Sequence, residues 1–465
     1  MIMNMRQNII IPLSKRVKTF IMSCIPAFLR RRISGRHNLQ RILINIAWLS
    51  FDKVFGMAVG FVVVLWMARY LGPSQFGEYS YALALVAIFS VLASGGVDQI
   101  IKRDIVRDGD SRDEVLGSAS AIIFASAIIA IILANITILA IRPEDTLLRS
   151  LVAVASSAMF FQIFSTIDYW FQSQVRVKFA VWAKNGAIVV IAIVKLTLIQ
   201  LHAPVIAFMW AGVAEAALTA IGMVTIYHLS GLSVLAWRVR YGRIKYLLHQ
   251  SWPLLLASIA TIVYMRIDQV MLGEMLDSKA VGIYTAASRL TEFWYFLPIA
   301  IGISVFPTIV KTKNDNPEFY IDRIRKLLTV LVGLAYVVAI PVSFFSDSIV
   351  NIVFGDAYAG AGKVLTIYVW ASVFVFMGVA QTLWNINENL QRIIWLRTAA
   401  CAVLNVILNL ILIPKYGVLG AASSSLVSHA FISYFSNLLS KETHVMFKLQ
   451  SRALVLGWGS SRVRK

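Results

Sequence analysis

Ionisable residues inside long apolar segments are the positions in this chain best suited to chemistry. A charge at the centre of a bilayer costs about 2.5 to 3.5 kcal/mol on insertion scales, so such residues usually face a polar cavity or a partner. Basic ones suit anion binding, and acidic ones suit ion coupling or gating. The basic candidates are Lys53, Lys184, Lys195, Arg266 and Arg289, and the acidic candidates are Asp52, Asp168, Glu215, Asp268 and Glu292.

Two lysines define one stripe of a predicted helix. Lys184 and Lys195 are eleven residues apart, which places them on nearly the same face, separated by roughly 16 Å along the axis. Two ammonium groups in a low-dielectric cavity would attract an anion such as a diphosphate. The alternative is that each side chain extends to its nearer membrane surface.

The remaining charges allow several roles. Arg289 and Glu292 are three residues apart and share a helical face, so they either line a charged cavity or pair to neutralise each other for insertion. Arg266 and Asp268 leave the same choice open. Asp52 and Lys53 are adjacent and point about 100° apart, so one is expected to contact a neighbouring helix.

Three other groups could take up a proton as access alternates. They are Asp168, Glu215 and His429, near the inner end of the fourth span and the middles of the sixth and twelfth. Desolvation of Glu215 would favour its protonated form. His429, flanked by serines, and Asn405 with Asn409 also suit plain packing and hydrogen bonding between helices.

Composition explains what positions these residues. Of 465 residues, 59% are hydrophobic and 14% are charged, against roughly 45 to 50% and 25% in soluble domains. The net charge of +20 lies in short clusters between apolar runs, which favours anionic lipid headgroups over nucleic acid as the partner. The two cysteines, Cys24 and Cys401, lack zinc or disulfide spacing.

Twelve segments are long and apolar enough to span a membrane as helices. We therefore expect an all-α integral membrane protein. The spans are placed near 44–69, 77–98, 115–140, 149–171, 179–200, 205–227, 251–272, 282–306, 327–346, 364–384, 393–413 and 418–440.

The distribution of Lys and Arg orients these spans. Alternate connections and the two termini hold 31 basic residues, whereas the opposite side holds five, Arg142, Arg149, Lys279, Lys363 and Lys415. By the positive-inside rule both termini are cytoplasmic. The opposite connections are short, which argues against an enzyme with a catalytic loop domain, and no GxxxxGK[ST] motif indicates ATP hydrolysis. We expect no cofactor and no metal.

The chain repeats internally. Leu71-Gly72 followed by residues 76–82, FGEYSYA, recurs loosely as Leu272-Gly273 followed by residues 281–287, VGIYTAA. A second match links Trp182 and Trp395, although such boundaries also recur by chance in helical membrane proteins. The repeat predicts two six-helix bundles around a central cavity. The expected parts are a basic tail (1–41), a first bundle (42–228), a basic linker (229–250), a second bundle (251–440) and a basic tail (441–465).

Several motifs resemble the Wzx-type polysaccharide flippases. They are residues 45–49 (NIAWL), 68–73 (ARYLGP), 76–79 (FGEY), 286–290 (AASRL) and 354–358 (FGDAY), and the likeness covers about residues 42–440. The resemblance places the chain in the polysaccharide-transporter branch of the multidrug/oligosaccharidyl-lipid/polysaccharide exporter superfamily. The tail of residues 1–41 is longer than usual for that family.

The resemblance implies a function and partners. It implies that an undecaprenyl-diphosphate-linked oligosaccharide is flipped across the cytoplasmic (inner) membrane for O-antigen, capsule or exopolysaccharide synthesis, alongside a polysaccharide polymerase and chain-length machinery. Two alternatives remain open at this point. They are an exporter of amphipathic small molecules and an integral glycosyltransferase or polymerase, for which no paired carboxylates stand out.

Overall fold

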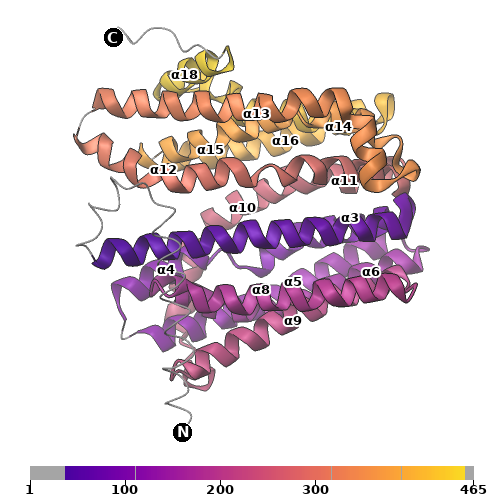
Figure 1. Cartoon of the computed structure of the whole chain (residues 1–465). Coiled ribbons are helices and arrows are strands. Elements are labelled where there is room, and N and C mark those ends of the chain that lie inside the picture. Colours follow the sequence, from indigo (N-terminus) through magenta and orange to yellow (C-terminus); the bar gives the residue numbers. More distant parts are fainter. Residues whose placement is uncertain (1–36, 110, 316, 389, 456–465) are drawn as a thin grey trace.

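The computed structural model describes residues 37–109, 111–315, 317–388 and 390–455, and these residues form helices and turns without a β-strand. The expected N-terminal tail lies almost wholly outside the described residues. Figure 1 shows two groups of long helices side by side, one from each half of the chain.

The first half contains eight helical segments: α3 (His37–Ala93), α4 (Asp98–Arg107), α5 (Arg112–Ile141), α6 (Thr146–Ser157), η1 (Ala158–Phe164), α7 (Ser165–Ser173), α8 (Val177–Gln200) and α9 (Val205–Leu229). A short turn, η2 (Val234–Ala236), lies in the linker. The second half contains α10 (Tyr241–Met275), α11 (Ser278–Phe293), α12 (Phe296–Asp315), α13 (Pro317–Phe354), η3 (Asp356–Tyr358), α14 (Ala361–Tyr368), α15 (Ala371–Asn387), α16 (Gln391–Tyr416), α17 (Val418–Ser433), η4 (Phe435–Leu438), η5 (Lys441–Thr443) and α18 (His444–Leu454).

Helix α3 holds two spans, because the chain reverses at Gly72. Its φ of 70° lies in the left-handed region that glycine adopts without steric cost. Before the turn, Asp52 contacts the early part of α8 and Tyr70 contacts the connection after α8. After the turn, Tyr81 contacts the last turns of α10, so the second part of α3 runs back along α10.

Ten described helical segments are long and apolar enough to cross a membrane. One of them contains both spans of α3, and the eighth crossing, which α11 and α12 form together, is not among the ten. With these two added, the described chain crosses twelve times, as the sequence predicts. The apolar side chains exposed on the outer faces fit lipid contact, as at Ile129, Ile136, Ile193 and Ile221.

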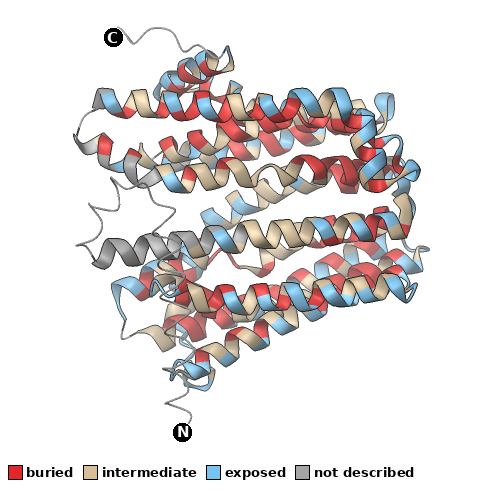
Figure 2. Ribbon diagram, viewed as in Figure 1, coloured by how far each residue is buried: buried red, intermediate tan, exposed pale blue. Residues whose placement is uncertain are grey.

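The two ends of the molecule are built differently. The first, here called the hairpin end, carries the turns at Gly72, 142–145, 201–204 and 276–277; the other, the linker end, carries α4, η2 and α18. One apolar core contains residues of both halves and lies toward the hairpin end, whereas two separate cores, one in each half, lie toward the linker end. The core shared by the two halves therefore lies at the hairpin end, and at the linker end the start of α10 packs into the core of the first half through Ile244 and Leu247. Figure 2 shows buried residues in both groups of helices.

Two glycines make the close junction at the hairpin end. A Cβ built on Gly77 would lie 1.6 Å from the Ser278 carbonyl oxygen, and one on Gly282 would lie 2.0 Å from the Pro73 carbonyl oxygen. Gly77 and Gly282 are 205 residues apart, as are Pro73 and Ser278, so the two contacts join equivalent positions of the two repeats. The contact is therefore nearly two-fold symmetric, and the repeated glycine lets α3 and α11 meet backbone to backbone.

The C-terminal residues 441–454 do not form a free tail. Helix α18 packs Met446, Leu449 and Ala453 into the core of the second half. The Tyr336 hydroxyl donates to the Leu454 carbonyl at 3.0 Å. This helix closes the linker end of the second half.

Candidate functional site: a cavity between the halves

A cavity of about 210 Å³ lies between the halves, next to the junction at the hairpin end. The first half lines it with residues of α3 and the second with residues of α10 and α11; the lining is Val64, Phe76, Tyr79, Ser80, Leu83, Ala84, Ala87, Arg266, Gln269, Thr285 and Arg289. The charged lining residues are Arg266 and Arg289. The wall is therefore apolar on one side and basic on the other.

Both arginines reach the same carboxylate. Arg266 Nη1 lies 3.8 Å from Glu292 Oε1, and Arg289 Nη1 lies 3.5 Å from Glu292 Oε2. The buried hydroxyl of Thr285, one turn from Arg289 on the same helix, has no hydrogen-bond partner in the structure. The cavity thus offers two cations and a free hydroxyl to an anion.

The first half encloses a second cavity, of about 380 Å³, among η1, α7, α8 and α9. Its charged lining residues are Asp168, Lys184 and Glu215. Lys184 Nζ donates to Asp168 Oδ2 at 2.7 Å. Lys195 Nζ lies 3.6 Å from Glu215 Oε2. The two lysines of the predicted stripe therefore each pair with a carboxylate from another helix, away from the cavity between the halves.

Asp52 and Lys53 lie in the first part of α3. Asp52 Oδ1 accepts a hydrogen bond of 3.0 Å from Asn185 Nδ2 on α8, which is the contact with a neighbouring helix expected for one of this pair. The side chain of Lys53 lies outside the described residues.

Asp268 lies in a buried cluster of the second half, away from Arg266. Its carboxylate accepts hydrogen bonds from Tyr284 Oη at 2.7 Å, from Asn409 Nδ2 at 2.5 Å and from the Ser425 hydroxyl. The Asn405 side chain adjoins Asn409. Among the described residues no Lys, Arg or His lies within ion-pair distance of Asp268, so neutral donors from three other helices hold its charge.

Sequence spacing missed a contact that bridges the halves at the hairpin end. The Tyr81 hydroxyl donates to Glu274 Oε1 at 2.6 Å, and Arg142 Nε lies 3.1 Å from the same oxygen. The guanidinium of Arg142 also donates to the Gly273 carbonyl. We call these residues, Tyr81, Arg142 and Glu274, the latch. The sequence signal for two of them is a charged residue two positions beyond the end of a predicted span, at Arg142 and Glu274.

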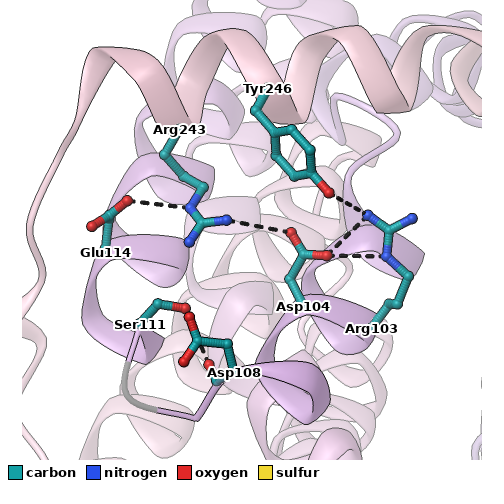
Figure 3. Close-up of polar contacts among 7 residues, drawn as sticks. All are labelled: Arg103, Asp104, Asp108, Ser111, Glu114, Arg243 and Tyr246. Carbon is teal, nitrogen blue, oxygen red and sulfur yellow. Dashed lines mark hydrogen bonds and ion pairs between the residues drawn. The ribbon is translucent and has the colours of Figure 1, made fainter.

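A second ionic cluster lies at the linker end and fastens the start of α10 to the first half (Figure 3). Arg243 lies between two carboxylates, with Nε 3.3 Å from Glu114 Oε1 and Nη1 3.7 Å from Asp104 Oδ2. Arg103 donates to Asp104 and, at 2.9 Å, to the Tyr246 hydroxyl. We call this cluster the clamp. Helix α10 is thus held by the first half at its start through the clamp and at its end through the latch, and it packs on α3, α16 and α11.

No group of three or more His, Cys, Asp or Glu side chains suited to a metal ion occurs among the described residues.

The described helices thus form two halves with a cavity lined by two arginines between them. Residues 66–363 match the family described as "Polysaccharide biosynthesis protein", and the chain belongs to this family. It is 26% identical over 404 residues to the "Probable low-salt glycan biosynthesis flippase Agl15" of Haloferax volcanii, a match that covers 82% of this chain and 80% of that protein.

Solved structures share the fold at low sequence identity. The "Lipid II flippase MurJ, inward closed conformation" is 15% identical, with a TM-score of 0.67 over 87% of this chain and 90% of that one. A multidrug resistance transporter of the MATE family in an inward-facing conformation is 14% identical, with a TM-score of 0.68 over 90% and 100%. The protein is a multi-pass membrane protein with a fold of the multidrug/oligosaccharidyl-lipid/polysaccharide exporter superfamily.

Proposed function

We propose that this protein flips an oligosaccharide linked to a polyprenyl diphosphate, such as undecaprenyl diphosphate, from the cytoplasmic to the outer leaflet of the cytoplasmic membrane. The observation that carries the proposal is the pair of arginines, Arg266 and Arg289, in a cavity between two membrane-spanning halves. Membership of a polysaccharide biosynthesis family and likeness to a glycan flippase agree with it. The glycan would serve an O-antigen, a capsule or an exopolysaccharide.

Charge orients the molecule in this proposal. The connections at the linker end carry most of the Lys and Arg, so this end faces the cytoplasm. The core shared by the halves then lies on the outer side and the two separate cores lie toward the cytoplasm, which suits loading from the inner leaflet. The substrate diphosphate would lie at Arg266 and Arg289, because two guanidinium groups in a low-dielectric cavity favour a divalent anion.

Reconstituted protein tests the proposal. Proteoliposomes containing a fluorescent polyprenyl-diphosphate oligosaccharide should show protein-dependent flipping, and Arg266→Gln with Arg289→Gln should reduce its rate by at least about tenfold. Lys415→Met, at an exposed site distant from the cavity, is the matched control. Absence of flipping with efflux of amphipathic drugs instead would replace the flippase by a drug exporter. In cells, deletion should cause single lipid-linked repeat units to accumulate in the inner leaflet.

We further propose that flipping is coupled to an ion gradient and that Asp268 binds the coupling ion. A buried carboxylate held by neutral donors gains from binding a proton or a monovalent cation. We expect Asp268→Asn to abolish the stimulation of flipping by an imposed proton or sodium gradient while basal binding of lipid persists. Asp356→Asn, at an exposed carboxylate, is the control. Equal stimulation of the Asp268→Asn variant and the wild type would rule Asp268 out.

A further inference from the structure

Glu292 holds a position that an incoming anion must compete for. Each of its carboxylate oxygens faces a different arginine, Arg266 at 3.8 Å and Arg289 at 3.5 Å. Both distances exceed an ordinary hydrogen bond, and the Glu292 side chain retains 22% exposure. The carboxylate is therefore close enough to attract both guanidinium groups without the short bidentate geometry that would lock them.

The order of three polar residues along α11 determines which of them an incoming anion meets first. Thr285, Arg289 and Glu292 are spaced four and three residues apart and so follow one face of the helix. Glu292 lies at the end of this stripe toward the linker end, and the unpartnered Thr285 hydroxyl lies at the other end, next to the outer junction. A substrate arriving from the linker end meets Glu292 before it reaches the arginines and Thr285.

We propose that Glu292 is an internal anion that occupies the arginine pair when the cavity is empty, yields it to the substrate diphosphate and takes it back when the substrate leaves. This inference rests on the proposed function. A diphosphate diester carries two negative charges against one on Glu292, so exchange is favourable in a cavity with two arginines. The displaced carboxylate repels the bound diphosphate, which keeps binding weak enough for release.

The competing interpretation is that Glu292 only neutralises two charges during insertion and folding. The two interpretations predict opposite effects of removing its charge. Loss of an internal competitor strengthens binding of the diphosphate, whereas loss of a purely structural counter-ion leaves binding equal or weaker and lowers stability.

Binding and flipping, measured on the full chain, separate these outcomes. The probe is a short-chain prenyl-diphosphate disaccharide, with the same compound bearing a single phosphate for comparison. We expect Glu292→Gln to bind the diphosphate about tenfold more tightly than wild type and to flip it several-fold more slowly, because release becomes limiting. Glu388→Gln, which removes the partner of Lys313 at the linker end, is the matched control and should leave affinity unchanged.

Two further variants keep the test decisive. Glu292→Asp retains the charge with a shorter reach and should give an intermediate affinity, which serves if Glu292→Gln folds poorly in a thermal-shift assay. Thr285→Val, nearly isosteric, should weaken binding several-fold because a hydrogen bond to a charged group is lost. Unchanged or weaker binding by folded Glu292→Gln and Glu292→Asp would overturn the inference. Absence of binding by the wild type would instead overturn the proposed function.

Discussion

At the scale of single residues, the two lysines of the predicted stripe on α8 are compensated by carboxylates of neighbouring helices. Lys184 on α8 pairs with Asp168 on α7, and Lys195 on α8 pairs with Glu215 on α9. The sequence spacing identified the lysine stripe, but a helical period relates residues of one helix only and says nothing of partners on others. These ion pairs neutralise both lysines within the first half. The basic wall of the cavity between the halves is therefore formed by the arginines of the second half.

The pair of Lys195 and Glu215 provides a test at this scale. Because a lone charge is costly in a membrane, Glu215→Gln or Lys195→Met alone should lower thermal stability in lipid nanodiscs, and the double variant should recover part of the loss. We expect a coupling energy of about 1 kcal/mol from the double-mutant cycle. Additive losses from the two substitutions would show that the ion pair contributes nothing to stability.

At the scale of elements, apolar lengths predicted the number of crossings and recurring motifs predicted the repeat, but neither predicted how the repeats meet. The length of an apolar run reflects the thickness of the hydrocarbon layer, so it does not predict how far a helix continues through polar residues beyond the membrane. Helix α10, for example, begins at Tyr241, ten residues before its predicted span. The same limit hid α18, whose short apolar stripe is buried by packing within the region predicted as a tail. The repeated glycines were visible in the sequence, whereas the contact between them depends on tertiary structure.

The close junction of α3 and α11 predicts that Gly→Ala lowers stability at the junction and does not lower it elsewhere in α3. At Gly77 or Gly282 an added methyl group would collide with a backbone carbonyl that has no room to move, so Gly→Ala at either site should destabilise the junction by about 1 to 3 kcal/mol. Gly60 lies in the same long helix α3 and has no atom within 4 Å of such a methyl group, so Gly60→Ala should be neutral or stabilising by about 0.5 to 1 kcal/mol.

Thermal denaturation of the three single variants in one detergent measures this contrast. Gly77→Ala and Gly282→Ala should resemble each other, since the two contacts are related by the repeat. Equal tolerance of alanine at Gly77 and Gly60 would mean that the helices separate readily, and that the junction does not determine how the halves close.

At the scale of the whole molecule, the latch and the clamp sit at opposite ends of α10. The latch joins Glu274, at the end of α10, to the first half at the hairpin end, whereas the clamp holds the start of α10 on the first half at the linker end. Pro253 lies between them and lacks the N–H that would complete the helical hydrogen bond. If transport proceeds by alternating access, as proposed above, we expect α10 to bend near Pro253 and the latch to break when the hairpin end opens.

Neutralising Glu274 should shift the molecule toward the state that is open at the hairpin end. The Arg142 and Glu274 side chains are 27% and 28% exposed, so the pair is worth about 1 kcal/mol, which corresponds to about a fivefold change in the population ratio.

Spin labels at Glu144 and Asp356, exposed at the hairpin end of each half, report the separation in a cysteine-free background. Glu274→Gln should enlarge the long-distance population, and the exchange Arg142→Glu with Glu274→Arg should partly reverse the shift. Arg149→Gln is the matched control, because Arg149 bonds within the first half only. A distance distribution in Glu274→Gln identical to that of the wild type would show that the junction alone, without the latch, holds the hairpin end closed.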